Sequence, residues 1–378
     1  MRTMRFLRLP LLALTCAALL LAGCRDEKII ERMGFTRTVA LDLPDGEEDK
    51  TKLKVTISIP KSEPANARIV LTTIAQSNKE ARIMFSRQNN RQIVSGQLRA
   101  VLFGEQLAKD GLWKNIDTFV RDPSIGSKVN VIVVNGNANA LLQRNYKQFP
   151  STGEYIEDLV RTERGATEIP LSNLHTFTRD YFDDGIDPVA PLIKEGKEAL
   201  ALDGIALFRD DVFVMRVEPQ KSLLFNFMHK NFVTGEVVMA LPIQEGEQQR
   251  IMLSFVASNR KIKIRHAKTI RGGEDIQVHF HLKIRGEVLE YHGKLNLQKT
   301  PDQKELEKRM KAYVESETMH LLEKMQQLRI DPLGIGQHVR NRMTFAQWKK
   351  LDWREMIPDL KIRVTADVKI KDIGKLQS

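Results

Sequence analysis

The sequence is poor in cysteine and in the short motifs that mark catalytic sites. Two cysteines in 378 residues exclude a disulfide-stapled fold and a zinc centre built from several cysteines. The spacings of a serine-hydrolase elbow, a zinc protease, a phosphate-binding loop and a dinucleotide-binding turn are absent, so we expect no catalytic residue, metal or cofactor. Apolar residues are dispersed beyond position 22, which argues against several membrane spans.

The N-terminus carries the longest apolar run, and its pattern predicts a lipoprotein signal. Three arginines in the first eight residues precede an apolar stretch at 9–22 that is too short to span a membrane comfortably. The stretch ends in Leu-Ala-Gly before Cys24, which resembles a bacterial lipobox. In such a motif the cysteine thiol takes a diacylglyceryl group and the chain is cut before it. We expect residues 1–23 to be a signal peptide and Cys24 to be the lipidation site. The alternative is an ordinary secretory signal with an incidental Cys24.

Lipidation would leave the mature chain without a free thiol. Cys16 lies in the segment that would be removed, so no intramolecular disulfide remains possible. The acyl chains would hold a soluble body outside the cytoplasmic membrane, because each buried CH₂ contributes roughly 0.8 kcal/mol. Nucleic acid is therefore not an expected partner, although the formal net charge of the whole chain is +11.

In the first half, the apolar pattern predicts a sheet covered by helices. Alternation after a Pro-Asp-Gly turn indicates a hairpin, and a continuous apolar run near residue 130 indicates a strand buried on both faces. The predicted elements are a hairpin at 36–43 and 52–59, a strand at 99–103, helices at 105–111 and 112–120, a strand at 129–134 and a helix from about 138.

In the second half, the pattern predicts an antiparallel meander followed by a long helix. Thr300 is expected as the helix N-cap, with Gln303 closing a capping box. The predicted elements are a hairpin at 205–217, strands near 250–256, 260–265, 276–285 and 287–297, a helix from 300 to about 330 and a strand at 360–371.

The expected fold class is α+β, a multi-domain mixed α/β protein. An N-terminal sheet with helices would precede a C-terminal antiparallel meander with its long helix. Asp187-Pro188 and Pro191 predict a boundary near 190–200, so the expected domains are 24–195 and 196–378.

Three polar clusters suggest binding sites, and each has a plainer interpretation. Asn135–Asn139 follows a buried strand and opens a helix, so its amides can cradle an anion or can simply reverse the chain. His279 and His281 share a strand face, but cations on that face would repel a metal ion. The aspartates of residues 180–187 lack the spacing of a calcium loop. We expect a surface turn at 180–187 and no metal site at either cluster.

A basic strip lies at residues 258–271, which contain no acid. Lys261, Lys263 and Arg265 would share one strand face. Such a face can meet anionic lipid headgroups, or it can be a solvated or edge strand that lysine protects from pairing. The strip consists of Arg260, Lys261, Lys263, Arg265, Lys268 and Arg271.

Stretches spread over nearly the whole chain carry a family resemblance. They are the lipobox at Cys24, the segments 39–42, 101–112, 119–123, 131–138, 203–211 and 331–336, the pair Phe345 and Trp348, and the closing strand at 364–374. In this order they resemble the Ger(x)C lipoproteins, the C subunits of nutrient germinant receptors in endospore-forming bacteria. Arg25 departs from the family pattern, since many members carry an aromatic residue after the cysteine.

The resemblance implies mixed α/β domains without enzymatic activity. It implies two integral-membrane partners, an A and a B subunit, at the inner spore membrane. Together these would sense amino acids, sugars or nucleosides and trigger the release of ions and dipicolinate. The resemblance carries over Cys24 as the lipidation site and gives no catalytic residue.

Two other classes remain open. A lipid-anchored solute-binding protein of a nutrient transporter would also be tethered outside the membrane, but it would show two α/β lobes joined by crossover strands. A surface-anchored hydrolase acting on the cell wall lacks any motif in the sequence.

Overall fold

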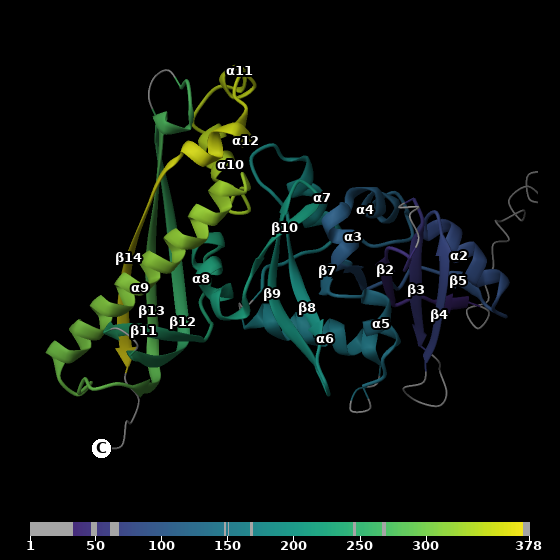
Figure 1. Cartoon of the computed structure of the whole chain (residues 1–378), viewed down its shortest axis with the longest axis horizontal. Helices are drawn as coiled ribbons and strands as arrows, with labels where there is room; N and C mark the ends of the chain where they lie inside the picture. The colour runs from purple at the N-terminus through teal and green to yellow at the C-terminus, as the bar shows by residue number, and fades with distance from the viewer. Residues whose placement is uncertain are drawn as a thin grey trace, which may run out of the picture.

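The computed structural model describes residues 33–46, 51–60, 68–146, 149, 151–166, 169–244, 247–266 and 270–372, and these form an elongated body with a sheet in each half (Figure 1). The predicted signal peptide at 1–23 and the predicted lipidation site Cys24 lie outside the described residues. Within the described ranges, no helix is long and apolar enough to cross a membrane.

The first half is built on an eight-stranded sheet, called here the large sheet, in the order β10-β9-β8-β7-β6-β2-β3-β4. The neighbours β2, β6, β7 and β8 are parallel, and antiparallel strands flank them on both sides. The predicted hairpin at 36–43 and 52–59 is confirmed as β2 and β3. The strands are β2 (Thr38–Asp42), β3 (Leu53–Pro60), β4 (Arg68–Ala75), β6 (Ala100–Gly104), β7 (Asn130–Asn135), β8 (Val189–Glu195), β9 (Leu200–Arg209) and β10 (Val212–Val217).

Helices cover both faces of the large sheet, which explains why its central strands are apolar throughout. In β6, Val101 and Phe103 join the buried cluster under α3, α4 and α7, whereas Leu102 joins the cluster under α5 and α6. The helices are α2 (Asn78–Arg87), α3 (Glu105–Asp110), α4 (Trp113–Val120), α5 (Ala138–Gln143), α6 (Thr152–Gly165) and α7 (Leu174–Phe182). Two short strands, β1 (Met33–Phe35) and β5 (Gln92–Val94), pair beside α2.

The second half is built on a four-stranded sheet, called here the small sheet, in the order β11-β12-β13-β14. Its strands are β11 (Val237–Gln244), β12 (Glu247–His266), β13 (Ile276–His292) and β14 (Lys361–Asp372). The long helix α9 (Thr300–Gln327) packs across one face (Figure 1). Phe280 and Leu282 of β13 are fully buried there with Met310 and Val314 of α9.

Four short strands were expected between 250 and 297, but the structure has two long ones. The register of β12 against β13 shifts between Ser254 and Ala257, and Phe255 there has φ +48°. This bulge interrupts the alternation of side chains, so the sequence pattern splits one strand into two. The last strand also differs from a pure meander, because β14 runs parallel to β13.

The expected capping box at Thr300 is wrong. Lys299 is the N-cap, and its side chain makes no capping hydrogen bond. The Gln303 side-chain amide instead donates to the carbonyl of Leu297 at 2.7 Å, and Asp302 accepts from the amide of Asn296 at 2.8 Å. The chain at 296–297 lies next to the first turn of α9, so its backbone groups come within hydrogen-bond distance of the Asp302 and Gln303 side chains.

One buried helix joins the two halves. Helix α8 (Pro219–His229) is buried on all sides from Ser222 to Met228, and its Leu224, Phe225 and Phe227 are at most 1% exposed. It lies between the two sheets (Figure 1), and a single cluster of buried side chains runs from the large sheet to the small one. The predicted division at 195 remains a prediction; β9 and β10, which follow it, complete the large sheet.

Candidate functional site

The segment that ends α7 meets the segment that follows α9, and we call this contact the junction. Asp187 lies at its centre and is 3% exposed. One carboxylate oxygen, Oδ1, accepts from the amide of Asp210 and from Arg354 Nη2, both at 2.9 Å. The other oxygen, Oδ2, accepts from the amide of Asp331 at 2.7 Å. Asp187 therefore ties the turn between β9 and β10 to two points in the C-terminal half.

Asp331 is the second buried carboxyl group of the junction. Its Oδ1 accepts from the amide of Ile335 at 2.9 Å, and its Oδ2 accepts from the amide of Gly336 at 2.7 Å and from Trp353 Nε1 at 3.1 Å. Burial raises the pKa of Asp331 to about 7, although these donors oppose the rise by stabilising the carboxylate. The side chain thereby holds α10 (Ile335–Arg340) and α12 (Trp353–Met356) together.

A more exposed layer of ion pairs surrounds these two carboxyl groups. Asp183 accepts from Arg340 at 2.8 and 3.0 Å and from Gln337 Nε2 at 2.9 Å. Burial alone would raise the pKa of Asp183, but hydrogen bonds from Arg340, the Gly185 amide and Gln337 hold it below its ordinary value. Asp184 contacts Arg340 at 2.8 Å and Lys349 at 3.2 Å. The prediction of a surface turn at 180–187 holds only in part: the chain turns at 184–185 and Asp184 is exposed, but Asp180 and Asp187 are buried. Asp183, Asp184 and Asp187 bind cations of the C-terminal half.

Backbone contact at the junction is close. The amide of Gln337 donates to the carbonyl of Gly185 at 3.0 Å. A Cβ atom at position 185 would lie 2.7 Å from that same amide nitrogen, so a larger residue would push the two segments apart. Glycine at 185 is thus required by the approach of α10.

A hollow of about 350 Å³ opens at the junction, and exposed aromatic side chains lie near it. Phe182 contributes to its lining and is 68% exposed. Phe345 is 73% exposed and lies against Lys349, the partner of Asp184. Exposed aromatic side chains of this kind are enriched in protein interfaces.

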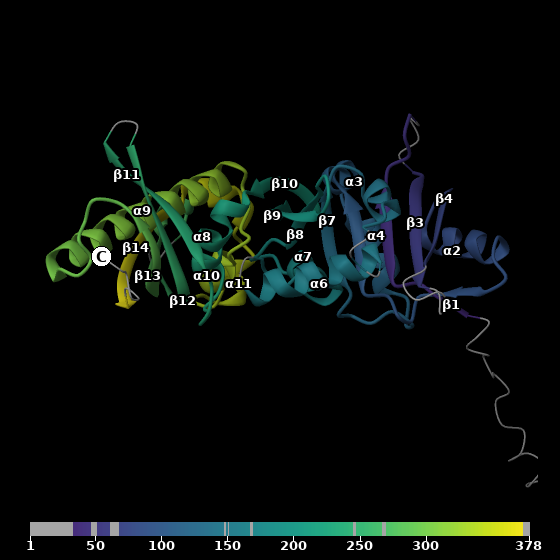
Figure 2. The same ribbon diagram turned by 90° about the horizontal axis from the view of Figure 1, so that it is seen from below.

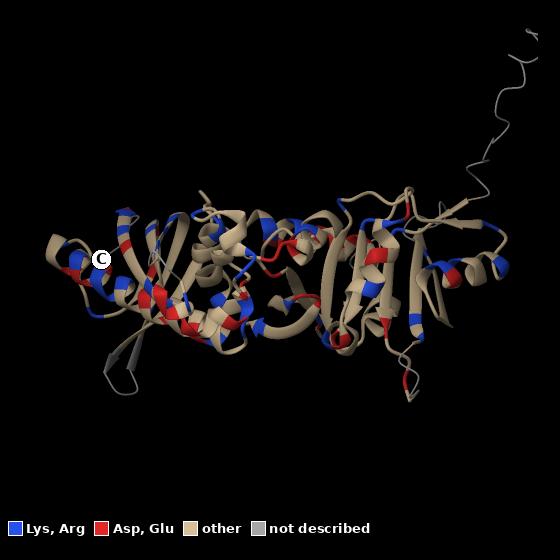
Figure 3. Cartoon of the chain, turned by 90° about the horizontal axis from the view of Figure 1, so that it is seen from above, with Lys and Arg blue, Asp and Glu red and all other residues tan. Residues whose placement is uncertain are grey.

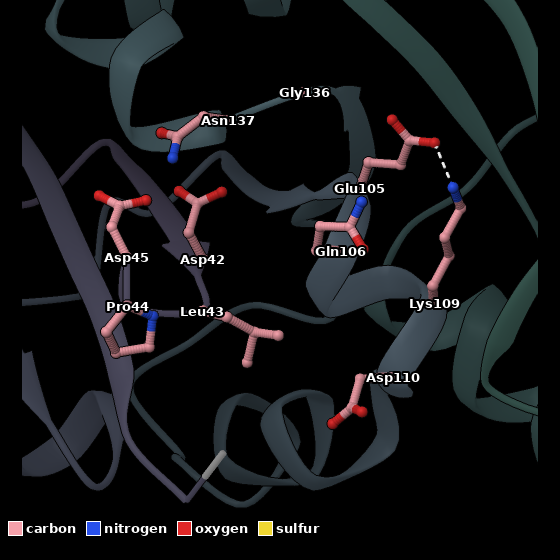
Figure 4. Close-up of a pocket in the computed structure, with 10 residues that line it drawn as sticks. All are labelled: Asp42, Leu43, Pro44, Asp45, Glu105, Gln106, Lys109, Asp110, Gly136 and Asn137. Atoms are coloured by element: carbon pink, nitrogen blue, oxygen red, sulfur yellow. Dashed lines mark hydrogen bonds and ion pairs between the residues drawn. The ribbon is translucent and has the colours of Figure 1, made fainter. Parts of the chain in front are cut away.

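A second hollow, of about 530 Å³, lies at the carboxyl ends of β2, β6 and β7. In α/β proteins this edge of the sheet is where ligands commonly bind. Here the side chains of Asp42 and Asp45 point toward Asn137, while Glu105 pairs with Lys109 at 2.6 Å (Figure 4). Among its described lining residues, acids outnumber bases and no serine, cysteine or histidine is present.

At Asn135–Asn139, where the sequence left open an anion site or a simple chain reversal, the helix amides bind a carboxylate of the protein itself. The amides of Ala138 and Asn139 donate to the two carboxylate oxygens of Asp42, at 2.9 and 2.7 Å. Burial raises the pKa of Asp42 to about 6, and these two hydrogen bonds moderate the rise. Gly104 permits the contact, since a Cβ there would lie 1.9 Å from an Asp42 oxygen. A free anion would have to displace this carboxylate.

The histidine pair of β13 makes protein contacts. His279 Nε2 and His281 Nδ1 lie 2.8 and 3.1 Å from the hydroxyl of Thr365. Within the described ranges, no group of three or more His, Cys, Asp or Glu side chains is arranged to hold a metal ion.

The sequence pattern did not identify the junction as a site. Asp187 and Asp331 lie 144 residues apart, and each precedes a proline, so each pattern indicates only the end of an element. The only feature of the sequence that pointed to the junction was the Asp-Pro pair, which occurs beside an apolar segment at both positions.

Comparison with known proteins agrees with this architecture. Residues 26–195 match the family of the spore germination protein N-terminal domain, and residues 203–374 match that of the spore germination B3/GerAC-like C-terminal domain. Spore germination protein GerQC of Bacillus cereus is 26% identical over 94% of this chain and 96% of its own length. Spore germination protein B3 of Bacillus subtilis (strain 168) is 22% identical over 94% of this chain and 95% of its own length.

The fold is also shared with a solved structure. The crystal structure of the GerBC protein covers 90% of this chain and 98% of its own chain, with a TM-score of 0.56 and 17% sequence identity. The mixed α/β fold class is thereby confirmed. The class defined by the two matched domains is that of spore germination proteins. Within that class, the chain belongs to the Ger(x)C family of germinant receptor C subunits, which is not an enzyme family.

Replacing Asp187 by alanine tests the junction. The change leaves the amides of Asp210 and Asp331 without their acceptor, while Arg354 loses one carboxylate and keeps that of Asp210. Each buried polar group left without a partner costs about 1–3 kcal/mol, so the unfolding free energy should fall by about 2–5 kcal/mol. A matched control is Glu355→Ala, which removes the exposed Arg329–Glu355 pair and should cost less than about 1 kcal/mol. Equal losses in chemical denaturation would contradict the central place of Asp187.

The pKa of Asp331 predicts a pH dependence. The folded chain keeps this proton up to about pH 7, whereas an unfolded aspartate releases it near pH 4. The folded state thus binds more protons in this interval, and this contribution to the unfolding free energy falls as the pH rises through it. Asp331→Asn should be less stable, and its deficit relative to the unsubstituted chain should shrink between pH 4 and 7. A constant deficit across that interval would refute the assignment.

Proposed function

We propose that this chain is the lipid-anchored C subunit of a nutrient germinant receptor, acting by protein–protein contact when spore germination is triggered. Cys24 carries the lipid, and the body lies on the outer face of the cytoplasmic membrane, which is the inner membrane of the spore. Its partners are the integral-membrane A and B subunits. Membership of the Ger(x)C family over nearly the whole chain is the observation that carries this proposal.

The geometry supports a role in contact rather than in chemistry. The buried carboxyl groups at the junction are engaged by backbone amides and by Arg354, so they serve cohesion. The exposed Phe182 and Phe345 near the junction offer apolar area for a partner protein.

The rival function, a lipid-anchored solute-binding protein, has no observation in its favour. Such a protein would need two α/β lobes, whereas the second half here is a small sheet with one long helix across it. The hollow at the carboxyl edge of the large sheet already holds Asp42 against the amides where a ligand would bind.

Cys24→Ala tests the anchor. Without the thiol no acyl chain can attach, so the protein should move from the membrane fraction to the soluble fraction, and germination should weaken. Cys16→Ala is the matched control, since that cysteine lies in the predicted signal peptide and should leave both readouts unchanged. Full membrane retention and normal germination of the Cys24 variant would count against the anchor.

A further inference from the structure

Among the described residues, helices cover only one face of the small sheet. Helices α8 and α9 lie against the face that carries Ile264, Phe280 and Val364, and these side chains are buried. On the opposite face, Lys261, Lys263 and other alternate residues of the strands are exposed. Figure 2 shows β12, β13 and β14 on the lower side of this half, with α9 above them. We call this open surface the basic face.

Cations from three strands meet on the basic face. Lys263 of β12 lies opposite His279 of β13, which in turn lies opposite Arg363 of β14. Together with Arg265 and Lys361 they line a hollow of about 340 Å³. Strand pairing therefore assembles a positive patch from segments a hundred residues apart (Figure 3, where blue predominates on these strands).

Within the part of the chain that the structure describes, no carboxylate lies within 4 Å of the Lys263, Arg265, Lys361 or Arg363 head groups. On α9, by contrast, Arg309 pairs with Glu305 and Lys311 pairs with Glu315. Asp367 is the acid on the same face of β14, and it lies two register positions beyond Thr365, away from the hollow.

Edge protection by lysine does not explain the whole face. Lysine often protects an edge strand from pairing with another chain, and Lys263 lies on the part of β12 that β11 does not pair with. The same face, however, carries exposed Lys283 and Arg285 on β13, which is paired on both sides there. The pKa of His279 is lowered by burial and by the nearby charges of Arg363, His281, Lys263 and Arg265, so the local potential is positive. Holding like charges close together costs electrostatic free energy, and binding an anionic partner would offset this repulsion.

We propose that the basic face binds the anionic headgroups of a phospholipid membrane. A membrane presents many phosphate groups side by side, which suits cations gathered on one open sheet face, and each cation near such a surface strengthens binding. A membrane is the favoured occupant because the chain is held next to one by its proposed anchor.

The position of the first described strand agrees with this orientation. In Figure 2, β1 lies at the lower edge of the other half, on the same side of the body as the basic face. Met33 follows Cys24 by nine residues, a span of at most about 30 Å. The anchor and the basic face can therefore reach one membrane plane, with the long axis of the body parallel to it. This orientation rests on the proposed anchor, whereas the affinity of the face for lipid does not.

The test uses residues 25–378, which keep every described helix and strand and have no acyl chain. Binding is measured by co-sedimentation with vesicles of phosphatidylcholine, with and without phosphatidylglycerol. We expect binding only with phosphatidylglycerol, and loss of it between about 0.1 and about 1 M salt, where the Debye length falls from ~10 to ~3 Å.

A double variant, Lys263→Gln with Lys361→Gln, should bind about 30-fold more weakly, since two cations near the surface are lost. The matched control is Lys304→Gln with Lys308→Gln, which removes the same charge from the exposed side of α9 and should bind as the unsubstituted chain does. Both variants should keep the melting temperature of the unsubstituted chain, because all four side chains are exposed.

Three outcomes would overturn the proposal. The first is no binding to phosphatidylglycerol vesicles, and the second is an equal loss of vesicle affinity in the two double variants. The third is an affinity for soluble polyphosphate equal to that for the vesicles, because the ligand would then be a soluble polyanion rather than a membrane. Because the chain tested has no anchor, each result is independent of whether Cys24 is lipidated or the receptor assignment holds.

Discussion

Two neighbouring buried carboxyl groups, Asp187 and Asp331, are the constraint on which the rest of the structure depends. Like charges cannot be buried together without compensation. Here the backbone amides of Asp210, Asp331, Ile335 and Gly336, together with Arg354 and Trp353, supply the compensation. These donors come from three stretches of the chain, at residue 210, at 331–336 and at 353–354. The carboxyl groups therefore fix the turn between β9 and β10, the end of α9 and the short helices after it at the same point.

The junction and the buried helix α8 together join the large sheet and the small sheet into one body. The hydrophobic cluster that crosses from the large sheet to the small one supplies the apolar part of the connection, and the junction supplies its polar part. A body held together in this way keeps its ends at a fixed distance. Under the proposed orientation, the anchor end and the basic face would both rest on the membrane.

Much of this fold follows from local sequence pattern, because strands and helices with one buried face repeat at their own periods. Strand β3, the start of α5 and the alternation of β14 were predicted in this way, and so was the lysine-bearing face of β12. The sequence pattern predicted two short strands in place of each of β12 and β13, because a bulge at Phe255 interrupts the alternation of buried and exposed side chains. The junction and the occupation of the helix amides by Asp42 depend on contacts across 144 and 96 residues, which no local pattern encodes.

The account makes this chain a working part of a nutrient receptor, and dipicolinate release from spores that lack it tests that claim most directly. Release is followed across a panel of amino acids, sugars and nucleosides, with dodecylamine as a trigger that bypasses the receptors. The account predicts loss of the response to one group of nutrients, with the dodecylamine response unchanged. Normal release with every nutrient, in spores that also lack any paralogous receptor, would contradict it.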